Sequence, residues 1–195
     1  MNKRSWLMMA SALCLTSSVW AQTTKPVRII VAFAAGGPVD AMARTIAEPL
    51  SRALGRTVLV ENRPGASGAI GANEVLRAEP DGATMWLTSV GAVAINPALY
   101  PKLSYNMARD FVPVSLVANN VELFVTGAKS TAKDAVEFMT EARQSKSSMP
   151  IASSGKGTIS HLAGELFKFN TRVNMVHVPY RGGGPALIDV LGGQV

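Results

Sequence analysis

The chain has 195 residues, of which 48% are hydrophobic, and a formal net charge of +6. Lys3 and Arg4 supply two of these charges and the other basic residues are scattered, so the clustered basic stripe of a nucleic-acid-binding protein is absent from the sequence. The single cysteine, Cys14, lies in an apolar N-terminal run, which leaves no thiolate metal site or disulfide in the rest of the chain.

The N-terminus is predicted to be a signal peptide, residues 1–21. A basic start precedes the apolar run 6–19, and Val19-Trp20-Ala21 fits the small-residue rule for cleavage after Ala21. A retained membrane anchor is the alternative, but the run is shorter than a comfortable transmembrane span. Cleavage would remove Cys14 and export the remainder.

The first half of the remainder alternates between strand and helix. Residues 27–33 form a nearly continuous apolar strand, as in a parallel sheet buried on both faces. A helix over 40–54 follows, with Gly55 where a helix end favours glycine and Pro49 predicting a kink or an early end. Further elements are expected in the order strand 57–61, helix 69–78 and strand 84–88. This alternation predicts a doubly wound α/β domain over residues 22–118.

A second, incomplete α/β domain is predicted over residues 119–195. Its expected elements, with the strands that lead into it, are strands 111–118 and 122–126, a helix from a capping box at Thr131–Asp134 to about 145, strand 150–153, helix 159–169, strand 173–178 and helix 185–191. The apolar residues predicted to face inward from the two longer helices are Ala135, Val136, Met139, Ala142, Leu162, Ala163, Leu166 and Phe167.

Two strands run directly into glycine-rich turns that precede helices. The first turn holds Gly36-Gly37 and the second holds Gly155-Lys156-Gly157. A helix start has unpaired N–H groups and a partial positive charge, and glycine lets the backbone approach a ligand closely. Two such turns facing each other would hold an anion from both sides.

Several motifs, taken in this order, resemble the tripartite tricarboxylate transporter substrate-binding family, also called Bug receptors. They are Pro26–Val31 with Gly36-Gly37 and Asp40, Val60–Ala66, Pro80-Asp81-Gly82, Ile95–Tyr100, Asp110–Val114, His161–Phe167 and Val176–Gly182. The resemblance covers residues 25–195. It implies a periplasmic two-domain receptor of the Venus-flytrap (periplasmic-binding-protein) fold, and a chain that would continue past residue 195, so that this one would be a C-terminally truncated member.

The resemblance also implies a ligand-binding set. Its members are Phe33, Gly36, Gly37, Asp40, Ser89, Ser154, Gly155, Thr158, His161, Tyr180 and Gly182. Asp40 would brace the first turn or cap its helix, because a carboxylate repels an anion. His161 is open to two interpretations, a ligand donor or a packing residue bonded to the backbone. Lys156 and Arg181 would either face the ligand or point to solvent.

The chain departs from the family at several positions, among them Lys156, which stands where many relatives carry asparagine. Pro38 removes one N–H from the first turn, Val39 replaces a common serine or threonine, and Val93 replaces a common histidine. These changes leave fewer side-chain donors in the first turn and predict a more apolar pocket edge.

The implied function is capture of a small carboxylate-bearing solute and its delivery to a transporter with large and small membrane subunits. We expect a monomer that binds no nucleic acid, cofactor or metal and is not an enzyme. A sensory receptor is one alternative. A secreted serine hydrolase using Ser153 or Ser154 with His161 and Asp189 is another, although the Gly-x-Ser-x-Gly elbow is missing.

Overall fold

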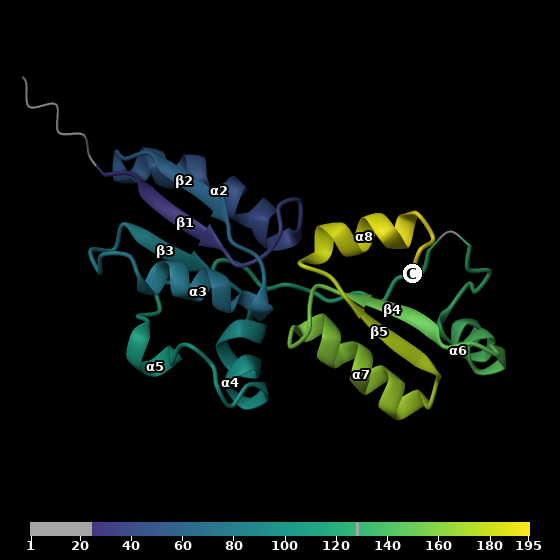
Figure 1. Ribbon diagram of the computed structural model, residues 1–195. Coiled ribbons are helices and arrows are strands. Elements are labelled where there is room, and N and C mark those ends of the chain that lie inside the picture. Colours follow the sequence, from purple (N-terminus) through teal and green to yellow (C-terminus); the bar gives the residue numbers. More distant parts are fainter. Residues whose placement is uncertain (1–24, 128) are drawn as a thin grey trace, which may run out of the picture.

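The computed structural model describes residues 25–127 and 129–195, so the predicted signal peptide lies outside the described residues. Figure 1 shows two α/β lobes side by side. The first lobe, residues 27–110, contains β1 (Val27–Val31), α2 (Pro38–Leu54), β2 (Val58–Asn62), η1 (Ala66–Gly68), α3 (Ala69–Leu76), β3 (Thr84–Leu87), η2 (Gly91–Ile95), α4 (Asn96–Leu99) and α5 (Met107–Asp110). The second lobe, residues 135–191, contains α6 (Ala135–Gln144), β4 (Met149–Ser153), α7 (Ile159–Thr171), β5 (Met175–Pro179) and α8 (Gly183–Leu191).

The first lobe is built on a parallel sheet with the strand order β2-β1-β3. Successive side chains of a strand point to opposite faces. Ile29 and Val31 therefore pack on one face with Ala43 of α2, while Arg28 on the other face reaches Glu74 of α3 at 3.0 Å. The central strand is almost inaccessible to solvent, which confirms the predicted two-sided burial.

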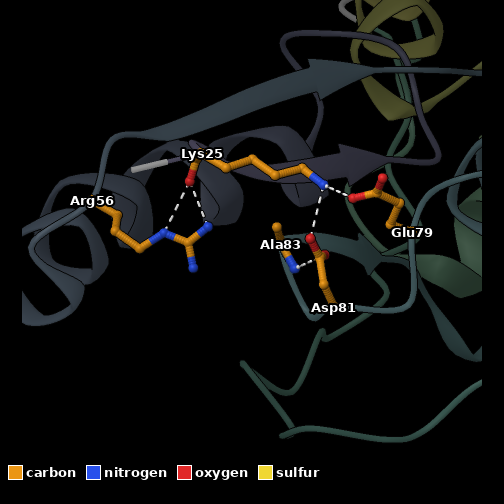
Figure 2. A network of polar contacts seen from close by, with 5 residues as sticks. All are labelled: Lys25, Arg56, Glu79, Asp81 and Ala83. Atoms are coloured by element: carbon orange, nitrogen blue, oxygen red, sulfur yellow. Dashed lines mark hydrogen bonds and ion pairs between the residues drawn. The ribbon is translucent and has the colours of Figure 1, made fainter. Parts of the chain in front are cut away.

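The amino ends of the three strands are tied together on one side of the sheet (Figure 2). The Lys25 ammonium lies 2.6 Å from Glu79 and 2.8 Å from Asp81. The Arg56 Nε donates to the Lys25 carbonyl at 2.9 Å, and Asp81 accepts the Ala83 N–H at 2.8 Å. The ion-paired side chains of Lys25, Glu79 and Asp81 are exposed, so these ion pairs align the strands more than they stabilise the fold. The carboxyl ends of the strands, at the opposite edge, lead to the glycine-rich turns.

Helix α2 ends as its sequence predicts but does not break at Pro49. Gly55 adopts the left-handed conformation, with φ 61°, and its N–H bonds to the Ser51 carbonyl. Of the two outcomes predicted at Pro49, the early end is wrong, because the helix runs on to Leu54. Pro49 and Thr45 are exposed, so the carbonyl deprived of its partner faces water.

The predicted strands 111–118 and 122–126 are wrong, because residues 111–126 carry no strand. Strands need a neighbour to bond their backbone groups, and in the described part of the chain no strand pairs with this segment. Its aromatic residues anchor it instead. Phe111 packs 5.0 Å from Trp86 in the first lobe, and Phe124 packs 4.9 Å from Phe167 in the second. The predicted division of the chain at residues 118/119 falls inside this segment.

The second lobe pairs β4 with β5 in parallel, and α7 and α8 lie on opposite faces of the pair (Figure 1). The predicted capping box at Thr131 is displaced by three residues. Asp134 is the N-cap of α6 and accepts the N–H groups of Val136 and Glu137, while Glu137 accepts the N–H of Lys133.

The helix faces in this lobe also differ from prediction. In α6, Ala142 is buried as predicted, but Val136 is exposed and Phe138 is buried in its place. In α7, Phe167 joins the core, whereas Leu162 and Leu166 are exposed. A side chain at Gly164 would meet the Ile151 side chain of β4 at 3.0 Å. The face of α7 that contacts the sheet is therefore the one that carries Gly164, not the one that carries Leu162 and Leu166.

Candidate functional site

The first glycine-rich turn follows β1 and is braced by one buried carboxylate. The Asp40 side chain accepts the Gly36 N–H at 3.0 Å, the Arg44 guanidinium at 3.0 Å and the Asn62 amide at 2.9 Å. The same Asn62 amide also donates to the Phe33 carbonyl at 3.1 Å. Asp40 is thus a brace rather than a helix cap, since the N-cap of α2 is Gly37. The Gly36 amide, which the sequence suggested as an anion donor, is directed to Asp40.

The electrostatics of Asp40 agree with this role. Burial alone would raise the pKa of the Asp40 carboxyl, but hydrogen bonds from Arg44, Gly36 and Asn62 outweigh it and hold the pKa below its usual range. The carboxylate is therefore charged at neutral pH, and it lies directly beneath the turn.

The second glycine-rich turn follows β4 and is braced by hydroxyl groups. Thr158 is the N-cap of α7, and its hydroxyl donates to the Gly155 carbonyl at 2.6 Å. The Gly155 N–H donates to Ser153 Oγ at 3.1 Å, and the Ser154 N–H donates to Ser160 Oγ at 3.1 Å. As in the first turn, local side chains use the N–H groups.

Two stacked histidines support the second turn from below. The rings of His161 and His177 lie 4.1 Å apart, and His161 Nδ1 accepts the Gly157 N–H at 3.1 Å. His177 Nε2 hydrogen-bonds Ser153 Oγ at 2.6 Å. Burial, followed by the neighbouring His161, lowers the pKa of His177. His161 therefore bonds to the backbone, which was one of its two interpretations from the sequence.

The hydrolase triad does not assemble in this arrangement. His161 is directed to the Gly157 amide, and Asp189 accepts the Tyr180 hydroxyl at 2.6 Å. Ser153 does meet a histidine, but it meets His177 and is itself only 3% exposed. A nucleophile needs access to its substrate and a base oriented by a third group. In the described residues no hydrogen bond to a carboxylate orients His177.

A third turn, residues 180–184, joins the two lobes. The Ala34 N–H donates to the Arg181 carbonyl at 2.9 Å. A side chain at Gly184 would lie 3.0 Å from the Gly36 carbonyl carbon, so only glycine permits this approach. Gly182 has a φ of 148° and lies against Ala34. The first turn and the start of α8 are therefore in direct backbone contact.

The lobes meet a second time at the Lys156 carbonyl. The Ser67 hydroxyl donates to this oxygen, and the Tyr100 hydroxyl lies 3.4 Å from it. Asn96 is fully buried behind them and donates to the Ser67 carbonyl at 2.7 Å. A side chain at Gly157 would meet Asn96 Oδ1 at 2.9 Å. The second turn thus packs closely against the first lobe.

A cavity of about 440 Å³ lies between these contacts, with a size typical of small-molecule sites. It is lined by Ala32, Phe33, Pro64, Gly65, Ala66, Ser67, Gly68, Ile70, Tyr100, Ser154, Gly155, Lys156, Pro179, Tyr180 and Arg181. Both lobes contribute to it. A second cavity of about 480 Å³ is lined by residues of the 97–109 region of the first lobe and includes none of the three turns.

The structure places the predicted site residues in two groups. Phe33, Ser154, Gly155 and Tyr180 line the cavity. The lining does not include Gly36, Gly37, Asp40, Ser89, Thr158, His161 or Gly182. Most of these lie in or behind the turns, while the Ser89 carbonyl accepts the Ala92 N–H at the start of η2.

Sequence reasoning missed the segment after β2. Residues 64–68 and Ile70 form much of the first-lobe wall, and Tyr100 closes it. The Pro64-Gly65 pair predicts a turn. The residues around a turn do not indicate whether that turn faces a cavity, because this depends on tertiary packing. Lys156 and Arg181, left open between ligand and solvent, both line the cavity.

Two further properties concern the described residues alone. No group of three or more histidine, cysteine, aspartate or glutamate side chains in residues 25–127 and 129–195 is placed to hold a metal ion. Within the same residues, no helix has the length and apolar character needed to cross a membrane.

Two α/β lobes with the carboxyl ends of parallel strands facing a shared cavity define a periplasmic-binding-protein fold, as predicted. The model of the family described as "Tripartite tricarboxylate transporter family receptor" matches residues 42–195. The chain belongs to this family of periplasmic solute-binding proteins.

Three relatives illustrate the similarity. Protein BugT of Bordetella pertussis is 36% identical, over 88% of this chain and 53% of its own length. An R. palustris protein solved with adipate is 34% identical, with a TM-score of 0.84 over 90% of this chain and 58% of its own. MatC from Rhodopseudomonas palustris with bound malate is 32% identical, with a TM-score of 0.76 over 88% and 58%. The chain therefore spans about half the length of the curated relatives it matches.

Proposed function

We propose that this protein is an extracytoplasmic receptor that binds a small carboxylate-bearing solute and delivers it to a tripartite tricarboxylate-type membrane transporter. One observation carries the proposal: both charged residues that line the interlobe cavity, Lys156 and Arg181, are cationic. A cavity with this charge attracts anions, and guanidinium and ammonium groups form the stronger, charge-assisted hydrogen bonds to carboxylates.

The relatives support the same chemistry. The two R. palustris proteins were solved with adipate and with malate, and both ligands carry carboxylates. In this chain the anion would be held mainly by Lys156 and Arg181, because the Gly36 and Gly155 amides already bond to Asp40 and Ser153. This differs from the amide clamp suggested by the glycine-rich turns alone.

Binding would couple to closure of the two lobes. The solute would touch the first-lobe wall at Phe33 and the second-lobe wall at Ser154, so that only the closed arrangement offers both sets of contacts. A ligand shifts such an equilibrium by its differential affinity for the two states. The closed, loaded form is what we propose the large and small membrane subunits recognise, with the receptor acting as a monomer in the periplasm after cleavage behind Ala21.

The test is titration calorimetry of the protein, as its gene encodes it, with mono-, di- and tricarboxylates. We expect at least one acid to bind, and Lys156→Gln and Arg181→Gln each to weaken it roughly 10- to 150-fold, since a hydrogen bond to a charged group contributes about 1.5–3 kcal/mol. Lys146→Gln and Arg77→Gln are matched controls, because both side chains are exposed and neither lines the cavity. A panel without any binding acid would contradict the proposal.

Delivery needs a separate measurement. Uptake of the bound acid by cells that express the receptor and both membrane subunits should fall to background when the receptor is deleted. Unchanged uptake with intact binding would instead favour the sensory role.

A further inference from the structure

The two walls of the cavity differ sharply in chemistry. The first-lobe wall is formed mainly by apolar groups: Phe33, Pro64, Ala66 and Ile70, with two glycines between them. No cation and no carboxylate of the described first lobe lines the cavity. The first lobe therefore presents a mainly hydrocarbon surface to whatever binds.

The hydroxyls of the first-lobe wall are directed away from a ligand. Ser67 donates to the Lys156 carbonyl, and the Tyr100 hydroxyl lies within 3.3 Å of Ser67 Oγ and 3.4 Å of that carbonyl. A ligand carboxylate placed against this wall would lose its hydration without gaining a charged partner. The cost of such burial is large compared with the gain from any single neutral hydrogen bond.

The second-lobe wall has the opposite character. Lys156 and Arg181 are exposed, and among the described residues neither side chain has an ion-pair partner. The neighbouring hydroxyls are already bonded, Tyr180 to Asp189 at 2.6 Å and Ser154 to Ser160 at 2.8 Å. The two cations are therefore the main anchors available for an anionic head group.

From this polarity we infer that the preferred solute is a single-headed carboxylic acid with an apolar body, an alkyl or aryl monocarboxylate rather than a polar tricarboxylate. The inference rests on the proposed function and narrows it. The carboxylate binds at Lys156 and Arg181 of the second lobe, and the hydrocarbon body lies against Ile70 and Phe33 of the first. A compact acid with charge on every side has no partner on the first-lobe wall.

The experiment is a calorimetric series with the protein as its gene encodes it: butanoate, hexanoate, octanoate and benzoate, with citrate as the polar comparison. Each methylene that enters the apolar wall should tighten binding about fourfold, as expected for burial of a CH₂ group. Citrate should bind at least about 100-fold more weakly than octanoate, because part of its charge would face hydrocarbon.

Two variants separate the walls. Ile70→Asn should flatten the dependence on chain length, whereas Leu76→Asn, a partly exposed residue of the same helix that does not line the cavity, should leave it unchanged. Arg181→Gln should weaken the whole series by a similar factor and preserve the dependence on chain length. The inference is overturned if citrate binds as tightly as octanoate or if affinity ignores chain length. Failure of every acid would overturn both this inference and the proposed function.

Discussion

The two glycine-rich turns share one backbone feature, a left-handed glycine two residues before the helix, and have different supports. Gly36 in the first turn has a φ of 78°, and Gly157 in the second has a φ of 82°. The first turn is held by one buried carboxylate, Asp40, and the second by hydroxyls and an imidazole. A shared turn shape therefore says little about which chemical group holds it.

The difference decides what each turn offers to a ligand. The first turn directs its Gly36 amide to the Asp40 carboxylate, so this donor is already occupied when an anion approaches. The second turn carries Lys156 at its tip and no carboxylate in its hydrogen-bond network. The cationic residue therefore belongs to the second turn, whereas the charged group of the first turn is a carboxylate.

Substitution of the two left-handed glycines should give the largest contrast. Alanine at either position incurs backbone strain of about 1 kcal/mol or more. At Gly36 nothing lies within 4 Å of the added carbon, but at Gly157 it would meet Asn96 Oδ1 at 2.9 Å and Leu99 at 3.2 Å. We expect Gly157→Ala to lower the free energy of unfolding by about 3 kcal/mol, and Gly36→Ala by about 1 kcal/mol. Urea denaturation followed by circular dichroism measures both, and equal losses would contradict the packing difference.

Removal of the buried charge of Asp40 should have the next largest effect on the free energy of unfolding. Asp40→Asn leaves Arg44 and the Gly36 amide without a carboxylate, which should cost about 2 kcal/mol in the first lobe. Because the folded pKa of Asp40 is lowered, its contribution is complete above the unfolded pKa and is lost as pH falls through the folded value. Fluorescence of Trp86, the tryptophan in β3, reports this lobe. The variant should lose part of the acid-induced destabilisation, and an unchanged acid profile would exclude Asp40 as the brace.

The helix cap of the second turn should have a smaller effect. Thr158→Ala removes the hydroxyl that bonds the Gly155 carbonyl and the His161 N–H, at a cost of about 1 kcal/mol. Since no titrating group is lost, the destabilisation should be the same at neutral and mildly acidic pH. Thr158→Ser, which keeps the hydroxyl, is the matched control. A loss that grows as pH falls would show that this turn too depends on a charge.

The alternation of strands and helices could be predicted because its signals are local. Apolar runs of strand length, Gly55 at a helix end and the glycines after β1 and β4 each act within a few residues. Where an element depended on a distant partner, prediction failed. Val112 and Val114 have the pattern of a strand, but no strand of the described residues pairs with them, and they are 86% and 83% exposed.

The candidate site also has parts that could be predicted from local sequence and parts that could not. Strand-to-turn patterns located the regions around Phe33 and Ser154, but the wall at residues 64–70 is brought to the cavity only by tertiary packing. The hydrogen-bond partners within the site were also hard to predict from the sequence when they lie far apart along the chain. That Asp40 takes the Gly36 amide is a local effect, four residues apart, whereas the contact of Ser67 with Lys156 spans 89 residues.

The smallest expected effect concerns the stacked histidines beneath the second turn, and it depends on pH. Burial and the nearby His161, Lys156 and Lys168 lower the pKa of His177, against an opposing effect of Glu165. Between that lowered value and the usual pKa of about 6.5, the unfolded chain binds more protons, so stability falls as pH falls. His177→Gln keeps a donor for Ser153 and removes the titration. The variant should therefore lose less stability than the parent between about pH 7.5 and about pH 5.5, measured by urea denaturation. Parallel losses would mean that protonation of His177 does not contribute to the pH dependence of stability.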